Sequence, residues 1–103
     1  MVKAPHVFIV NKGLHNYSQA ENFGESVIAL TQGTCSRVNA TKLLRTITPT
    51  LADATLEDWL LVSGPPLVNI LACCLFVLKH QRLNLLIYAS REELYIQRTL
   101  VFY

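Results

Sequence analysis

The stretch from Leu60 to Tyr88, LLVSGPPLVNILACCLFVLKHQRLNLLIY, constrains the fold more than any other part of the chain. Its sequence predicts a buried strand, a tight turn over residues 63–66, an apolar helix to about His80 and a second buried strand. Pro65 and Pro66 suit the start of that helix, where a missing amide hydrogen costs nothing. A strand, a helix and a further strand in this order indicate a right-handed crossover between parallel strands.

Apolar runs predict five strands, at residues 6–11, 26–33, 59–63, 82–89 and 94–103. The first, third and fourth are the most continuously apolar, which indicates central strands covered on both faces. The last strand alternates apolar and polar side chains and follows the four-residue loop SREE. We therefore expect it to return antiparallel, at one edge of the sheet.

Helix start signals separate the strands. Ser18 and Glu21 have the spacing of a capping box, which predicts a short helix with Ser18 as its N-cap. Asn39 is expected to cap the next helix, and Pro49 to end or kink it. The third helix, up to His80, is apolar nearly all round, so we expect it to pack against the sheet and to offer a surface to a partner.

The order β-α-β-α-β-α-β-β predicts an α/β protein. We expect a small three-layer, Rossmann-like domain with a mostly parallel sheet, helices on both faces and a C-terminal antiparallel hairpin. A chain of 103 residues is expected to form a single domain, residues 1–103.

The composition argues against several classes of protein. The longest apolar run, Leu67 to Leu78, is shorter than the roughly twenty residues that span a membrane. The first residues, MVKAPHVFIV, show no secretory signal, so we expect a cytoplasmic protein, in the host cytoplasm if the source is viral. The formal net charge is only +2 and the basic residues are scattered, which argues against a nucleic-acid partner.

The cysteines suggest neither metal nor disulfide. Cys73 and Cys74 are neighbours in a predicted helix, where their side chains point about 100° apart, and Cys35 lies in a loop. No spacing of cysteine and histidine is typical of a zinc site. We therefore expect buried, inert thiols, no metal and no cofactor.

Two loops follow central strands at the carboxyl edge of the expected sheet, where open α/β sheets bind ligands. The first, NKGLHNYS, is long for such a connection and rich in hydrogen-bonding side chains. Lys12 can hold a phosphate or carboxylate, Tyr17 can stack on a base, and Asn16 can read the edge of that base. The second loop is the turn at residues 63–66. The candidate ligand-binding residues are Asn11, Lys12, His15, Asn16, Tyr17, Ser63 and Gly64.

Both loops also have a purely structural interpretation. Asn and Gly in the first loop can serve turn geometry alone. The turn at residues 63–66 contains no glycine-rich phosphate motif, and its two prolines remove two amides that could hold an anion.

Catalysis has weaker support. Ser63 with His15, or Cys35 with His80 or His15, could pair as nucleophile and base, but no motif supports either pairing. We therefore assign no catalytic residue and keep a small hydrolase as an alternative. The carboxylates expected at the opposite, amino edge of the sheet are Asp53, Glu57 and Asp58.

Three segments, HNYSQAENFGE, LLVSGPPLVNILA and HQRLNLLIY, resemble small uncharacterised α/β proteins encoded by bacterial viruses. The resemblance implies a small cytoplasmic accessory protein that acts against host defence. It carries over no catalytic residue.

Two functions of different classes remain open. The first is a non-catalytic module that binds a small anionic, nucleotide-like ligand and so sequesters a host defence signal. The second is an interaction or assembly protein that acts through its apolar edge strand, which ends in TLVFY. The chain has 51% hydrophobic and only 16% charged residues, too few charges to cover the surface of so small a domain. We therefore expect a homo-oligomer whose contact uses that strand or the third helix.

Overall fold

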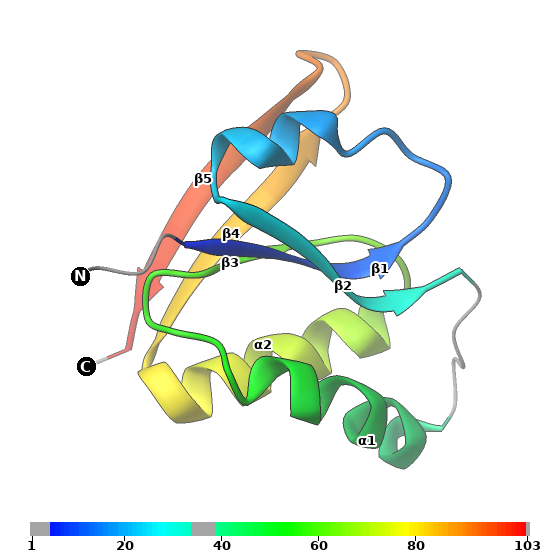
Figure 1. Ribbon diagram of the computed structural model, residues 1–103, viewed down its shortest axis with the longest axis vertical. Helices are drawn as coiled ribbons and strands as arrows, with labels where there is room; N and C mark the ends of the chain where they lie inside the picture. Colours follow the sequence, from blue (N-terminus) through cyan, green and yellow to red (C-terminus); the bar gives the residue numbers. More distant parts are fainter. Residues whose placement is uncertain (1–4, 34–38, 103) are drawn as a thin grey trace.

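The computed structural model describes residues 5–33 and 39–102 (Figure 1). In these residues the predicted α/β fold is confirmed. The elements in chain order are β1 (His6–Lys12), the 3-10 helix η1 (Ser18–Asn22), β2 (Ser26–Gln32), α1 (Ala40–Leu51), β3 (Trp59–Leu61), α2 (Pro66–His80), β4 (Arg82–Ala89) and β5 (Leu94–Val101).

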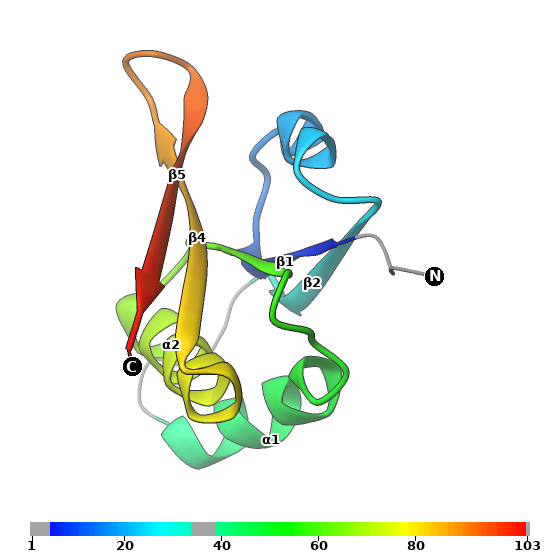
Figure 2. The same cartoon turned by 90° about the vertical axis from the view of Figure 1, so that its left-hand side faces the viewer.

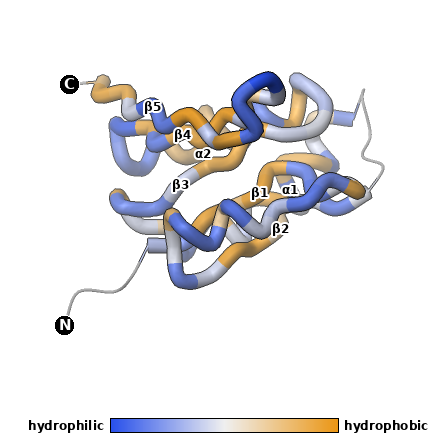
Figure 3. The backbone as a smooth tube through the Cα atoms, turned by 90° about the horizontal axis from the view of Figure 1, so that it is seen from above, coloured by the Kyte–Doolittle hydropathy of each residue, from blue (hydrophilic) through white to orange (hydrophobic). Residues whose placement is uncertain are grey.

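The strands form one five-stranded sheet in the order β2-β1-β3-β4-β5. The first four are parallel, and β5 pairs antiparallel with β4 across the hairpin. The apolar strands β1, β3 and β4 are central and β5 is at one edge, as the sequence predicts. Figure 3 shows hydrophobic residues along β1 and β4.

The two long helices lie side by side on one face of the sheet (Figure 2). They enclose a core that includes Phe8, Ile47, Leu60 and Phe76. The other face is covered by η1, because connections that run in opposite directions along a parallel sheet cross on opposite faces. A smaller core lies there, formed by Val7, Ile9, Ala20, Leu61, Leu86 and Tyr95.

One helix start agrees with the sequence and one does not. The side chain of Asn39 accepts the amide hydrogen of Lys42 at 2.9 Å and caps α1 as expected. The capping box at Ser18 is wrong: Ser18 is the first residue of η1, and its amide donates to Asn16 Oδ1 at 2.9 Å. Since the Asn16 side chain reaches its own backbone two residues on, it replaces the longer-range cap and leaves a short 3-10 turn.

Three further boundaries differ from the expectation. Helix α1 continues through Pro49 to Leu51, so the proline lies in its last turn. Strand β3 ends at Leu61, although the amide of Val62 still donates to Leu86 O. Strand β5 ends at Val101, and Tyr103 lies outside the described residues.

No helix in the described part of the chain is long and apolar enough to cross a membrane.

The thiols differ from the expectation in part. Cys73 is half-buried, and burial, with a smaller effect of Cys74, raises its pKa. Cys74 is exposed on α2, so the expectation of a buried thiol is wrong there. It is exposed because it lies on the side of α2 that faces away from the sheet. Cys35 lies outside the described residues.

Candidate functional site

The two candidate loops meet at the carboxyl edge of the sheet. They leave the neighbouring strands β1 and β3, and the hydroxyl group of Ser63 joins them. Its oxygen accepts the amide hydrogen of Asn11 at 3.1 Å, and the hydroxyl donates to the carbonyl of Asn11 at 3.0 Å. The connection from β1 to β2 and the connection from β3 to β4 leave this place on opposite faces of the sheet. It is therefore the switch point where open α/β sheets form their crevice.

Gly64 packs directly against Asn11. Its φ angle is +81°, and a Cβ atom added there would lie 2.5 Å from the Cβ of Asn11. The Asn11 side chain is itself buried, and its Oδ1 accepts the hydroxyl hydrogen of Thr31 at 2.8 Å. Asn11, Ser63 and Gly64 thus form a packed, hydrogen-bonded junction between the strand ends.

The side chain of Asn69 satisfies the turn at residues 63–66. Its Oδ1 accepts the amide hydrogen of Ser63 at 3.1 Å, and its Nδ2 donates to the carbonyls of Ser63 at 2.7 Å and Pro65 at 2.8 Å. Pro65 occupies the N-cap of α2 and Pro66 its first turn, and neither offers an amide hydrogen. These contacts favour the structural interpretation of this turn over an anion cradle.

The other four candidates line one pocket of about 370 Å³ on the η1 face. Lys12, His15, Asn16 and Tyr17 come from the loop after β1, and the floor is formed by apolar side chains of β1 and β2. Two further lining residues, Ser18 and Glu21, come from η1 and were not among the predicted site residues. The sequence singles out both residues through the capping-box spacing, which predicts a role in starting a helix and not in binding a ligand.

Aromatic side chains hold this loop against the sheet. The ring of His15 contacts the edge or face of Tyr17 at 5.3 Å and of Tyr88 at 4.7 Å between centroids. Tyr88 in turn contacts Tyr95 at 5.4 Å. The hydroxyl oxygen of Tyr17 accepts the amide hydrogen of Gly13 at 3.1 Å. The loop is therefore tied to β4 and to itself, which fixes the rings near the pocket.

Tyr95 is the buried end of this aromatic series. Its hydroxyl group has no hydrogen-bond partner among the described residues. Burial, and then the neighbouring hydroxyls of Tyr17 and Tyr88, raise the pKa of Tyr95. The alternation of apolar and polar residues in β5 indicates that one face of the strand is buried. The contact of Tyr95 with Tyr88 of β4, however, depends on the register of the hairpin.

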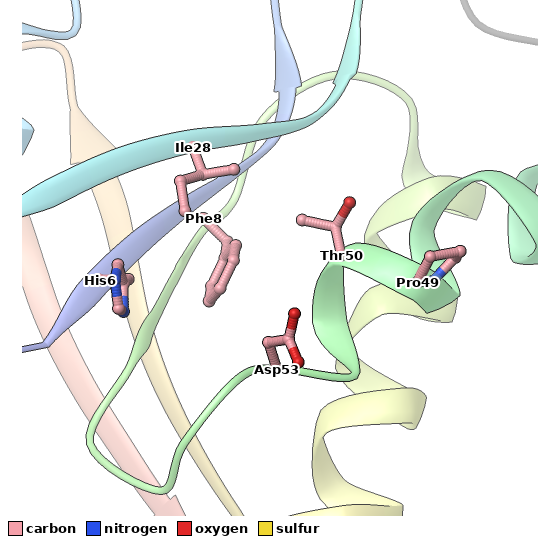
Figure 4. Close-up of a pocket in the computed structure, with 6 residues that line it drawn as sticks. All are labelled: His6, Phe8, Ile28, Pro49, Thr50 and Asp53. Carbon is pink, nitrogen blue, oxygen red and sulfur yellow. The ribbon is translucent and has the colours of Figure 1, made fainter.

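A second pocket, of about 460 Å³, lies at the amino edge (Figure 4). His6 and Phe8 of β1 face Thr50, in the last turn of α1, and Asp53, just after that helix. The remaining lining residues are Ile28 and Pro49.

Asp58 lies behind His6, with Oδ1 3.5 Å from His6 Nδ1. Its carboxylate is fully buried and accepts the amide hydrogens of His6 and Thr55, each at 2.8 Å. Asp58 therefore joins the starts of β1 and β3, and the acidic residues Asp53 and Asp58 lie away from the two loops, as expected.

No nucleophile–base pair forms among the predicted residues that the structure describes. The Ser63 hydroxyl is engaged by the backbone of Asn11, and His80 lies at the far end of α2, against Phe76. Within residues 5–33 and 39–102, no three His, Cys, Asp or Glu side chains gather as metal ligands would.

Comparison with curated proteins and with solved structures finds no match. A family model described as Phage Pam3 gp32-like protein matches residues 5–101, which confirms the resemblance to small phage-encoded proteins. The chain, matched over nearly its whole length, therefore belongs to the phage Pam3 gp32-like protein family.

Proposed function

We propose that the protein is a non-catalytic module that binds a small anionic, nucleotide-like ligand in the pocket beside the loop of residues 12–17. One observation carries the proposal: Lys12, Asn16 and Tyr17, three side chains suited to such a ligand, line a single pocket at the carboxyl edge of the sheet. This is the edge at which open α/β sheets bind their ligands.

Lys12 supplies the positive charge. Its side chain is exposed and makes no ion pair in the part of the chain that the structure describes. The N-terminus of α2 is a poorer alternative for an anion, because Asn69 already accepts the amide hydrogen of Ser63 and the two prolines have no amide hydrogen to donate. A phosphate or carboxylate in this pocket therefore depends on Lys12.

The neighbouring side chains suit the rest of a nucleotide. The ring of Tyr17 offers a stacking surface for a base. Asn16 uses Oδ1 to accept from Ser18, which leaves its Nδ2 to donate to an acceptor on the ligand.

Glu21 restricts the ligand further. A carboxylate in the same pocket repels a second anionic group but accepts hydrogen bonds from hydroxyl or amino groups. The pocket, at about 370 Å³, is near the lower end of the range of roughly 300–1,000 Å³ for small-ligand sites. These properties favour a single nucleoside monophosphate, linear or cyclic, over a dinucleotide or a polyphosphate.

A phage protein that binds such a ligand without converting it lowers the free ligand concentration in the infected cell. Sequestration of a host defence nucleotide is the biological role that we propose for the pocket.

Isothermal titration calorimetry against a panel of mono-, di- and cyclic nucleotides tests the proposal. We expect a nucleoside monophosphate to bind and Lys12→Ala to weaken that binding about tenfold or more, since a charge-assisted contact contributes roughly 1.5–3 kcal/mol. The matched control is Lys42→Ala, an exposed lysine on α1 at the other face. Absence of binding by every nucleotide, or equal losses in the two variants, would refute the proposal.

A further inference from the structure

The outer stripe of α2 has no polar side chain. The residues exposed at four-residue spacing are Pro66, Ile70, Cys74 and Leu78. Ile70 is 58% exposed and Leu78 82% exposed. A helix that covers a sheet normally has polar or charged residues on its outer face, and an entirely apolar helix is normally buried. The outer stripe of α2 therefore has the composition of a buried surface.

The end of β5 extends this apolar stripe. Leu100 pairs with Leu83, which belongs to the core under α2, so Leu100 lies on the face that α2 covers. The amide of Phe102 donates to Gln81 O at 3.0 Å and continues the ladder, and the Phe102 side chain is 55% exposed. Figure 3 shows the hydrophobic character of this C-terminal end.

A groove separates the helix from the strand end. It has a volume of about 410 Å³, and all its lining residues are apolar: Cys73, Cys74, Val77, Leu78, Leu83 and Phe102. Helices α1 and α2 pack on β1, β2 and β4, whereas the helix that contacts β5 is η1, on the opposite face of the sheet. The groove is thus the place where the helical layer of this fold ends.

We propose that the α2 surface, defined as Ile70, Cys74, Leu78, Leu100 and Phe102, binds the same surface of a second copy of this chain in a two-fold symmetric dimer.

The spacing of the stripe defines how two such helices meet. Side chains four residues apart form the ridge that packs into the matching groove of another helix, at a crossing angle of about −50° and an interaxial distance of roughly 8–10 Å. Cys74 lies between Ile70 and Leu78 in this stripe, and its side chain is smaller than either of theirs. A small residue at the crossing point lets the helices approach, and two-fold symmetry then places Cys74 next to the partner's Cys74.

The size of the surface agrees with a dimer contact. The exposed parts of the five side chains come to on the order of 500 Å² of apolar area, at the upper end for a monomer's largest patch. A standard interface buries about 800 Å² per partner, with an apolar centre and a polar rim. The α2 surface is therefore large enough to be the centre of such an interface. It lies on the opposite face of the sheet from the ligand pocket, so the two proposals are independent.

Thiol cross-linking tests the crossing point. In a chain with Cys35→Ser and Cys73→Ser, Cys74 is the remaining cysteine, and a short bismaleimide should join two copies into a covalent dimer on a denaturing gel. The matched control carries Cys35→Ser and Cys74→Ser and keeps Cys73, whose side chain points about 100° away along the helix. Equal cross-linking of the two, or none in either, would overturn the proposal.

Sedimentation equilibrium at about 100 μM tests the surface itself, a concentration at which a dimer of micromolar Kd is nearly complete. We expect twice the chain mass of 11.6 kDa for the native protein and a halved mass for Leu78→Glu. Leu14→Glu, the same change at a fully exposed leucine in the pocket loop, should remain dimeric. A monomeric native protein contradicts the proposal. A dimer that survives Leu78→Glu but not deletion of Thr99–Tyr103 also contradicts it, and assigns the contact to the edge of β5.

Discussion

Ser63 and Asn11 share two hydrogen bonds, of 3.1 and 3.0 Å, although 52 positions separate them in the chain. Through them the end of β3 holds the end of β1, from which the pocket loop leaves. Ser63 does not line the pocket, yet we expect the placement of Lys12 and Tyr17 to depend on it, because it holds the residue before their loop.

Ser63→Ala should lower the free energy of unfolding by about 1–3 kcal/mol, because it leaves the amide and carbonyl of Asn11 without their partner. It should also weaken ligand binding through the loop. Urea unfolding measures the first effect, and Ser90→Ala in the exposed hairpin loop is the control. Equal midpoints for the two variants would show that the junction contributes nothing to stability.

Gly64→Ala should be more damaging than Gly33→Ala. Both glycines have positive φ angles, +81° and +70°, which cost other residues about 1–2 kcal/mol. At Gly64 the added methyl group also meets Asn11 at 2.5 Å, whereas at Gly33 it meets no atom within 4 Å. Overpacking adds about 1–3 kcal/mol at Gly64 alone. Denaturant unfolding of the two variants isolates that difference, and equal losses would contradict the packed junction.

Local signals in the sequence account for most of the fold. Apolar, β-branched runs predict the central strands, and the Asn39 cap and the alternation of β5 act within a few residues. The Ser18 capping box fails because Asn16 competes for the same amide at closer range.

The candidate site is only partly predictable, because its geometry depends on distant contacts. Four of the seven candidates share a pocket. Ser63, 52 positions after Asn11 in the chain, and its neighbour Gly64 instead contact Asn11. The contact of His15 with Tyr88 likewise follows from the order of strands in the sheet, which no local pattern encodes.

Asp58→Ala should destabilise the protein by about 2–4 kcal/mol. The buried carboxylate accepts two amide hydrogens, from His6 and Thr55, and both would lose their partner. Asp53→Ala, at an exposed carboxylate of the same edge, should cost less than about 0.5 kcal/mol. Thermal unfolding of the pair measures the contrast, and a mild effect of Asp58→Ala would show that water can replace the carboxylate there.

The free energy of unfolding should decrease as the pH falls below about 6.5, because of His80. Burial, and then the charge of Lys79, lower the pKa of His80 below its ordinary value of 6.5. As the pH falls below about 6.5, the unfolded chain binds the proton before the folded one does, so the stabilising effect is complete above that pH and declines below it. Between about pH 7.5 and pH 5, the urea midpoint should depend less on pH in His80→Gln than in His15→Gln. An unchanged slope in His80→Gln would exclude His80 as the cause.

Amide chemical shifts in a nucleotide titration test the central claim most directly. With a nucleoside monophosphate bound, we expect the largest changes at the amides of Lys12, His15, Asn16, Tyr17 and Glu21, and none along α1 or the outer stripe of α2. Changes centred on His6, Phe8 and Asp53 at the amino edge, or no changes at saturating nucleotide, would contradict a ligand site at the carboxyl edge.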